Sequence, residues 1–141
     1  KYIKNPNGYI DKKIDCINRK EKIYKKNKFA CSILLSGSIE IKKLNYKFRK
    51  KNNSTDILSF PFYTKKKLEK ILKVKKDIYL GDIIINYEKI KNKKNKIKFL
   101  KEFDLLWIHG LLHLFGYKHK LNKDYKVMKK MEKKYFTYIN D

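Results

Sequence analysis

Residues 99–119 read FLKEFDLLWIHGLLHLFGYKH, and this stretch decides the fold and the candidate site. Its first part is apolar and long enough to predict a buried helix. His109 and His113 are four residues apart, so a helix turns both to one face, about 6 Å apart along its axis. Gly116 can adopt the left-handed conformation that ends a helix. The chain can then turn back and bring His119 toward the other two histidines.

These three histidines, the only ones in the chain, form a candidate metal site. Three neutral imidazoles around zinc leave a fourth position for water, which is typical of catalytic rather than structural zinc sites. Imidazole also suits nickel, copper or iron, so zinc is the default expectation. The alternative is three core or surface histidines with ordinary hydrogen bonds.

Gly110 follows the first histidine, at the position where zinc proteases with an HExxH motif have their general-base glutamate. A glycine inside a helix costs about 1 kcal/mol relative to alanine. We therefore interpret Gly110 as a place where backbone or substrate must come close. The missing carboxylate argues against peptide hydrolysis by that mechanism.

Apolar periodicity and turn signals predict one α+β domain over residues 1–141, with a mixed sheet of about four strands packed against helices. The metal site lies on a central helix and the turn after it. Gly81 predicts a bulge or a close backbone approach within its strand. Helices are expected over residues 11–27, after a turn at 5–8, and over 38–51, 99–115 and 122–139; strands are expected over 29–35, 56–62 and 78–87.

Two apolar stripes at helical spacing are expected to face the core. Residues 38–51 carry the first stripe, and residues 122–139 carry the second. The members of the two stripes are Ile41, Leu44 and Phe48, and Tyr125, Met128, Met131, Tyr135 and Tyr138, respectively.

The chain is strongly basic, with 38 Lys and Arg against 14 Asp and Glu and a formal net charge of +24. Arg19 and Arg49 are its only arginines. Because lysine, asparagine, isoleucine and tyrosine have AT-rich codons, part of the excess fits a low-GC genome. A surface with this charge still attracts polyanions, which favours a nucleic-acid partner over a merely solvated lysine coat.

Several protein classes are excluded or disfavoured. Cys16 and Cys31 cannot make a disulfide framework and are expected to be small buried residues in a reducing compartment. No apolar run approaches 18 residues, so no membrane-spanning helix is expected. Lys1–Lys28 is polar and basic without a small-residue cleavage site, which predicts no secretory signal peptide.

Residues 109–119, HGLLHLFGYKH, resemble the HGxLHLxGYDH signature of the YbeY endoribonuclease family, with Lys118 in place of its Asp. Residues 53–62, NSTDILSFPF, and 80–85, LGDIII, resemble two strands of that family, TDVLSFPF and LGDIVI, in the same order. Residues 44–49 match its LNxxYR stretch, with Phe for Tyr. The resemblance covers about residues 29–138.

This resemblance implies a small α+β domain with metal-dependent endoribonuclease activity on single-stranded RNA. It implies a role in maturation of the 3′ end of small-subunit (16S) rRNA and in ribosome quality control. The expected partners are single-stranded RNA and the small ribosomal subunit, in the bacterial cytoplasm or an organelle of bacterial descent. One zinc ion per chain is expected on His109, His113 and His119, with no small-molecule cofactor and no membrane partner.

The resemblance also makes Arg49 and His109 the candidate catalytic residues. A guanidinium can hold a phosphate through two parallel hydrogen bonds and stays charged at any working pH. Asp56, Asp82 and Gly110 are candidates to orient a metal ligand or to contact substrate. Two other functions remain open: a non-enzymatic rRNA-binding assembly factor with a structural zinc, and a zinc peptidase.

Overall fold

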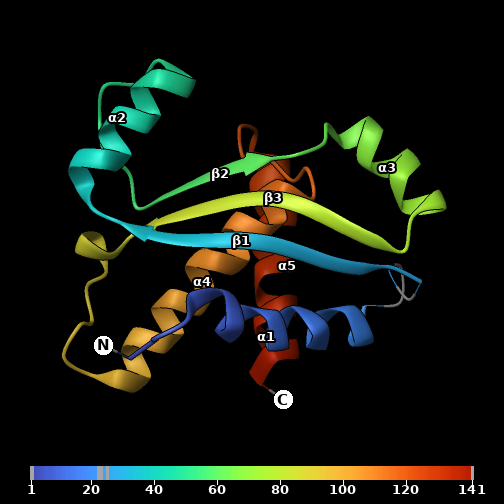
Figure 1. The fold of residues 1–141 in the computed structure, drawn as a ribbon, viewed down its shortest axis with the longest axis horizontal. Helices are drawn as coiled ribbons and strands as arrows, with labels where there is room; N and C mark the ends of the chain where they lie inside the picture. Colours follow the sequence, from blue (N-terminus) through green and yellow to red (C-terminus); the bar gives the residue numbers. More distant parts are fainter. Residues whose placement is uncertain (1, 22–23, 25, 141) are drawn as a thin grey trace.

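The computed structural model has an α+β fold built on a three-stranded mixed sheet in the order β1-β3-β2 (Figure 1). It describes residues 2–21, 24 and 26–140. Strand β1 (Lys28–Ser36) runs parallel to β3 (Asp77–Asn86), and β2 (Ile57–Pro61) runs antiparallel to β3. The predicted class is confirmed, with three strands in the described part of the chain instead of about four.

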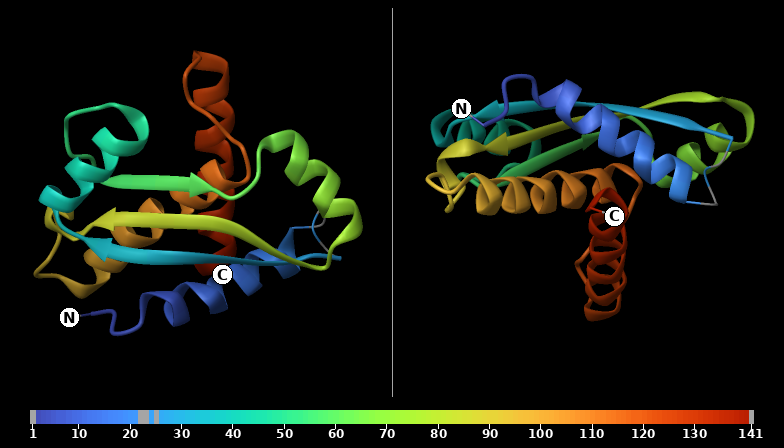
Figure 2. Two further views of the ribbon diagram at one scale, coloured as in Figure 1. Left: turned by 45° about the horizontal axis from the view of Figure 1, so that its top comes forward. Right: turned by 90° about the horizontal axis from the view of Figure 1, so that it is seen from below.

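Helices cover mainly one face of this sheet. Figure 2 shows α4 lying along that face, α1 beside the β1 edge and α5 projecting away from the layer. The main core lies between the sheet and these three helices, whereas α2 packs a smaller cluster against the opposite face. The helices are α1 (Pro6–Lys20), α2 (Ser38–Arg49), α3 (Lys65–Val74), α4 (Lys96–Leu114) and α5 (Asn122–Asn140), and Tyr87–Lys89 forms a short 3-10 turn, η2. None of the described helices has both the length and the apolar character needed to cross a bilayer.

Helix α1 begins earlier than predicted because the segment interpreted as a turn is its cap. The side chain of Asn5 accepts a hydrogen bond of 3.1 Å from the backbone N–H of Gly8, and Pro6 occupies the first turn. Proline suits that place because its fixed φ is already helical and its missing N–H has no partner there. The helix ends at Lys20, and residues 22, 23 and 25 of the predicted helix lie outside the described residues.

Helix α3 was not predicted at all. Thr64 caps it by accepting a 3.3 Å hydrogen bond from the N–H of Lys67. Only Leu68 is fully buried, while Ile71 and Leu72 are partly buried against the main core. A stripe this narrow among so many lysines gives a weak periodic signal, so tertiary packing decides this helix.

The apolar stripes are only partly buried as predicted. On α5, Met128 and Tyr135 are buried, but Tyr125 is 52% exposed and Glu132 is buried instead. The buried face passes through positions 128, 132 and 135, which follow the i, i+4, i+7 spacing of one helix face. On α2, Phe48 is 58% exposed.

Gly81 forms the predicted bulge. The register between β1 and β3 shifts between Ala30 and Ser32, opposite Gly81, whose φ is +139°. A Cβ atom there would lie 2.2 Å from the carbonyl oxygen of Phe60, so the neighbouring strand also comes too close for a side chain. Both halves of the prediction are confirmed.

We expect Gly81→Ala to lower the free energy of unfolding by about 2–5 kcal/mol, because it adds backbone strain and a clash with a strand. Gly37→Ala is the control: its φ is −100°, and the nearest atom to an added Cβ is the flexible end of Glu88, at 3.0 Å. The control should cost no more than about 1 kcal/mol. Urea denaturation followed by circular dichroism checks both, and equal midpoints would contradict the prediction.

Both cysteines are free thiols, as expected. Burial, reinforced by the charges of Asp11 and Asp82, raises the pKa of Cys31 to about 12. Cys16 donates a 3.1 Å hydrogen bond to the carbonyl oxygen of Tyr138. Cys31 is therefore a packing residue and a poor nucleophile at neutral pH.

Candidate metal centre

The C-terminus of α4 reverses the chain as predicted. The N–H of Gly116 donates to the carbonyl of His113, and the N–H of Tyr117 donates to the carbonyl of Leu112, both at 3.0 Å. With Gly116 at φ +101°, these two bonds form a Schellman motif, which satisfies the last carbonyls of the helix. The segment that follows carries His119 back along the helix.

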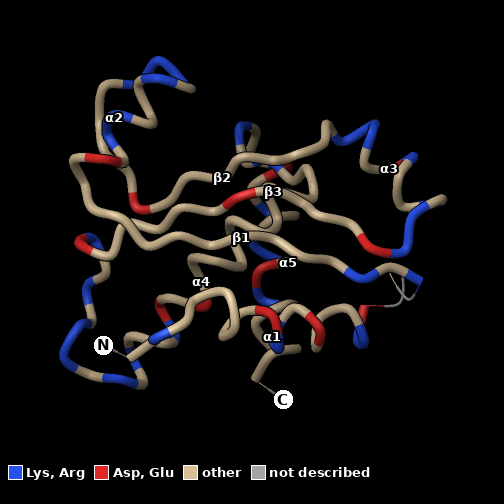
Figure 3. Tube along the Cα trace, viewed as in Figure 1, with Lys and Arg blue, Asp and Glu red and all other residues tan. Residues whose placement is uncertain are grey.

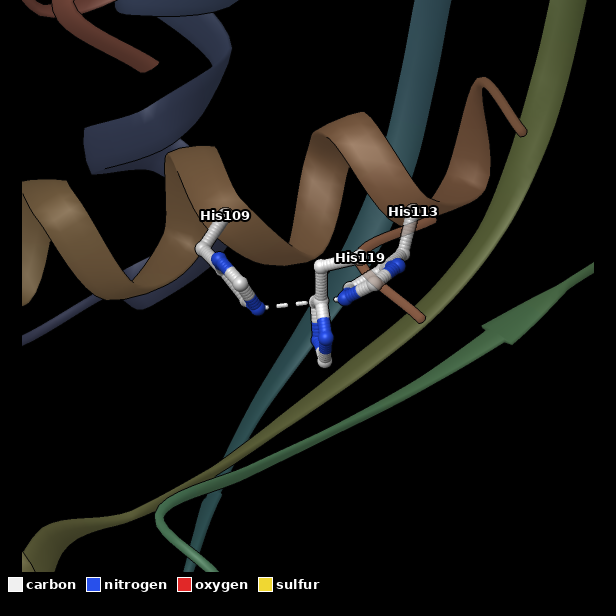
Figure 4. Close-up of side chains that lie close together, drawn as sticks. All are labelled: His109, His113 and His119. Carbon is white, nitrogen blue, oxygen red and sulfur yellow. Dashed lines mark hydrogen bonds between the residues drawn. The ribbon is translucent and has the colours of Figure 1, made fainter. Parts of the chain in front are cut away.

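The three histidines lie together, as Figure 4 shows. Their candidate donor atoms all lie within 4.8 Å of one another. His109 and His113 project from neighbouring turns of α4, and the His119 ring centroid lies 5.5 Å and 5.0 Å from theirs. The structure therefore brings the three predicted ligands to one place.

Hydrogen bonds behind two of the rings fix how they face the cluster. The Nδ1 atom of His113 donates to the carbonyl of Tyr117 at 2.9 Å, because a carbonyl oxygen can only accept. The Nδ1 atom of His109 lies 2.5 Å from Oε1 of Glu132. In the tautomer that has its proton on Nδ1, a histidine ring carries its lone pair on Nε2, and the Nε2 atoms of His109 and His113 lie 3.1 Å apart.

Two ring nitrogens this close need a cation between them, which is either the proton of a hydrogen bond or a metal ion, so this geometry fits a bound metal ion. Burial and the nearby charge of His109 lower the pKa of His113 to about 4, although its hydrogen bond to the carbonyl of Tyr117 acts in the other direction. His113 is therefore neutral at neutral pH, as a ligand must be. Metal-bound histidines typically donate their second N–H to a carboxylate or a carbonyl, and both arrangements occur here.

Glu132 is a positioning residue that the sequence analysis missed. Burial acts to raise the pKa of this carboxyl group, but the hydrogen bond to His109 and the charges of His109 and Lys129 outweigh it, and the pKa is lowered. Glu132 is thus an ionised carboxylate that holds the His109 ring in place. The signal available in the sequence was a glutamate on the apolar stripe of α5, since buried carboxylates need a partner.

Arg49, at the end of α2, lies close to this cluster. Its Nη2 atom donates a 2.9 Å hydrogen bond to the carbonyl of Ser59 on β2. Ser59 also bonds the carbonyl of Gly110, the neighbour of His109, so one residue of β2 contacts both Arg49 and the helix that carries the cluster. The charge of Arg49 is the smallest of the contributions that lower the pKa of His113. Arg49 as a whole residue is exposed to solvent.

Gly110 lets α4 sit directly on the sheet. A Cβ there would lie 2.9 Å from both Ile57 Cδ1 and Ile83 Cγ2, and 3.1 Å from Ser59 Oγ. The hydroxyl of Ser59 donates a 3.3 Å hydrogen bond to the carbonyl of Gly110. The close approach inferred from the sequence is thus made by the sheet, and Gly110 is buried.

The two candidate aspartates lie in different surroundings. Asp56 lines the same cleft as His109, a hollow of about 780 Å³. Asp82 alternates with Ile83, which faces the main core, so it points to the opposite face of the sheet. There it accepts a hydrogen bond from the hydroxyl of Tyr79. The structure therefore places Asp56 in the cleft that His109 also lines and leaves Asp82 on the other face of the sheet.

Known proteins are similar to this chain in sequence and in fold. The model of the family described as Endoribonuclease YbeY matches residues 4–140. The chain belongs to this family. The Endoribonuclease YbeY of Pelagibacter ubique is 45% identical over 114 residues, covering 79% of this chain and 71% of the relative. That of Buchnera aphidicola subsp. Acyrthosiphon pisum is 38% identical over 120 residues, covering 82% and 72%.

A solved structure agrees with the YbeY assignment at the level of the fold. The solution structure of TM1509 from Thermotoga maritima is similar to this chain with a TM-score of 0.57 and 26% sequence identity. The similarity covers 97% of this chain and 85% of that one. This chain therefore shares its overall fold with that protein.

Removing the carboxylate of Glu132, which contacts Nδ1 of His109, should weaken metal binding. We expect Glu132→Ala to lower the affinity for a divalent metal by about 10- to 100-fold, because His109 loses the acceptor that fixes its ring. Competition with a chromophoric chelator measures this. Glu69→Ala, which removes an exposed carboxylate of α3, is the control and should leave the affinity unchanged. Equal affinities of Glu132→Ala and the native chain would show that the contact does not support the metal.

Proposed function

We propose that this chain is a zinc-dependent endoribonuclease that cleaves single-stranded RNA. Membership of the YbeY family supports an RNA-cleaving hydrolase. The observation that carries the metal dependence is the pair of Nε2 atoms 3.1 Å apart on rings whose Nδ1 atoms are both held by acceptors. His109, His113 and His119 would hold the ion, and three histidine ligands suit zinc with an open position.

The residues of the candidate site would have different roles in catalysis. A metal ion held by His109, His113 and His119 would supply Lewis acidity toward a phosphoryl oxygen and a bound water. Glu132 and the carbonyl of Tyr117 keep protons on the Nδ1 atoms of His109 and His113, so the Nε2 atoms stay free for ligation. His109 thus belongs to the catalytic machinery as a ligand, and Asp56 is placed to contact substrate in the adjoining cleft.

Arg49 would stabilise the charge that develops on the phosphodiester. Its bond to the Ser59 carbonyl fixes one side of the guanidinium, while the exposed side can donate to phosphate oxygens. A donor that is already oriented costs little reorganisation during the reaction, and such a donor contributes about 10²–10³-fold to the rate.

We place this activity in maturation of the 3′ end of 16S rRNA and in ribosome quality control, in the cytoplasm of a bacterium. The small ribosomal subunit and its rRNA would be the partners. The bacterial relatives and the net charge of +24 support this assignment, since a basic protein binds polyanionic RNA. No contact among the described residues favours the assembly-factor or peptidase alternatives.

The decisive test is cleavage of a labelled single-stranded RNA that carries a small-subunit rRNA 3′ end. Native chain, His113→Ala and Arg49→Ala are purified identically and assayed with and without a chelator. We expect cleavage only by the metal-loaded native chain, with matched melting temperatures for the variants. Equal cleavage by all three would point to a contaminating ribonuclease. A folded, zinc-loaded native chain that cleaves nothing would contradict the proposal.

Arg49→Lys separates charge from geometry. Lysine keeps the charge but lacks the planar fork that can bond the Ser59 carbonyl and a phosphate together, so we expect a rate loss of about 10²-fold. Bound zinc, measured by elemental analysis, should stay at the native level. Arg19→Lys, on α1, serves as the control and should retain the native rate. Full activity of Arg49→Lys would rule out the role assigned to its guanidinium.

A further inference from the structure

The cleft beside the metal centre has a wall of lysines. It lies between the segment after η2, the N-terminal half of α4 and α5, and His109 and Glu132 are part of its lining. Figure 3 shows the basic residues gathered on the segment between β3 and α4, at the lower left of the view. The lysines that line the cleft are Lys89, Lys91, Lys98, Lys101 and Lys129.

The carboxylate of Glu102 holds the segment of residues 89–92, called here the lysine-bearing segment, against α4. Glu102 accepts hydrogen bonds from the backbone N–H groups of Lys91 at 2.9 Å and Asn92 at 3.2 Å, and from the Asn92 side chain at 3.0 Å. The segment is therefore fixed next to α4, which carries Lys98 and Lys101. This arrangement distinguishes the cleft from lysines scattered over a solvated surface.

Three of these ammonium groups have no partner among the residues that the structure describes. Lys89 donates to the carbonyl of Ser54, and Lys129 pairs with Glu132. Within the same described part of the chain, the side chains of Lys91, Lys98 and Lys101 make no hydrogen bond and no ion pair.

The acidic residues of the same cleft offset only part of this charge, because its lining has five lysines and three carboxylates. Glu102 is occupied by the backbone of the lysine-bearing segment, and Glu132 is occupied by His109 and Lys129. Asp56 accepts a hydrogen bond from the hydroxyl of Thr55. Like charges on one wall repel, and an anionic ligand removes that repulsion.

We propose that this cleft holds the phosphate backbone of the RNA on one side of the cleavage position, through Lys91, Lys98 and Lys101. The proposal rests on the proposed function, since it takes single-stranded RNA as the ligand. Lys98 and His109 are eleven residues apart on α4, which is about 16 Å along the helix axis. That distance exceeds a single phosphate, so the RNA must extend several nucleotides beyond the cleaved bond on this side.

The test compares two triple variants with the same change in net charge. Lys91→Gln, Lys98→Gln and Lys101→Gln together remove the free ammonium groups of the cleft. The control carries three glutamines for exposed lysines of α3, at the opposite end of the sheet in Figure 1. The control positions are Lys66, Lys70 and Lys73.

Binding of a short labelled single-stranded RNA is measured by fluorescence anisotropy over a range of salt concentrations, with a chelator present to prevent cleavage. Each phosphate contact contributes about 0.7 to the slope of log K against log[salt] for single strands. The cleft variant should lose about 2 from that slope and bind about 50-fold more weakly at about 0.15 M salt. The α3 control and a triple Lys→Arg variant of the cleft should keep the native slope.

The outcomes separate this inference from the proposed function. Equal slopes for the cleft variant and the α3 control overturn the cleft assignment, even if the native chain cleaves RNA. A slope lost only in the cleft variant supports it, even if the native chain cleaves nothing and the nuclease proposal fails. Melting temperatures confirm that each variant is folded before its slope is interpreted.

Discussion

At Gly110 the backbone of α4 comes so close to the sheet that a methyl group would lie 3.1 Å from the Ser59 hydroxyl oxygen and 2.9 Å from two isoleucine side chains. Ser59 makes two hydrogen bonds at this contact. Its hydroxyl donates to the Gly110 carbonyl, and its own carbonyl accepts from Arg49. One strand residue therefore fixes the helix that carries two histidines and also the arginine from α2. Any change that lifts α4 from the sheet separates these groups.

The part of the site that could be predicted is local in sequence. His109, His113 and His119 converge because a helical turn and a glycine-terminated helix end are set by nearby residues. The bulge at Gly81 could likewise be predicted, since a glycine inside an apolar strand often marks a bulge or the close approach of another backbone. The fold class followed from the irregular order of the elements. The boundaries of α1 were missed because Asn5 and Pro6 fit a turn and a helix start equally well.

The rest of the site depends on contacts between distant parts of the chain. Glu132 reaches His109 only because α5 packs across α4, and no spacing rule predicts that crossing. Asp82 lies in the stretch of residues 80–85 that resembles a family strand. The bulge in β3 and the alternation of its side chains nevertheless decide which face of the sheet Asp82 occupies. The net charge likewise does not predict which lysines are available to a ligand. Lys13 pairs with buried Asp104 at 2.9 Å, whereas Lys98 has no partner in the described structure. The position of a lysine, and not the total of +24, distinguishes a structural cation from one available to RNA.

The order in which the site residues occur along the chain has a consequence for synthesis. During synthesis the N-terminal part of the chain leaves the ribosome first, while further residues are still being added. The sheet and Arg49 are therefore made first, the histidines follow, and Glu132 arrives with α5. Until α5 emerges and docks, His109 lacks the carboxylate that orients it. A nascent chain without α5 thus lacks one contact of the candidate metal site, which is complete only once α5 has docked on α4.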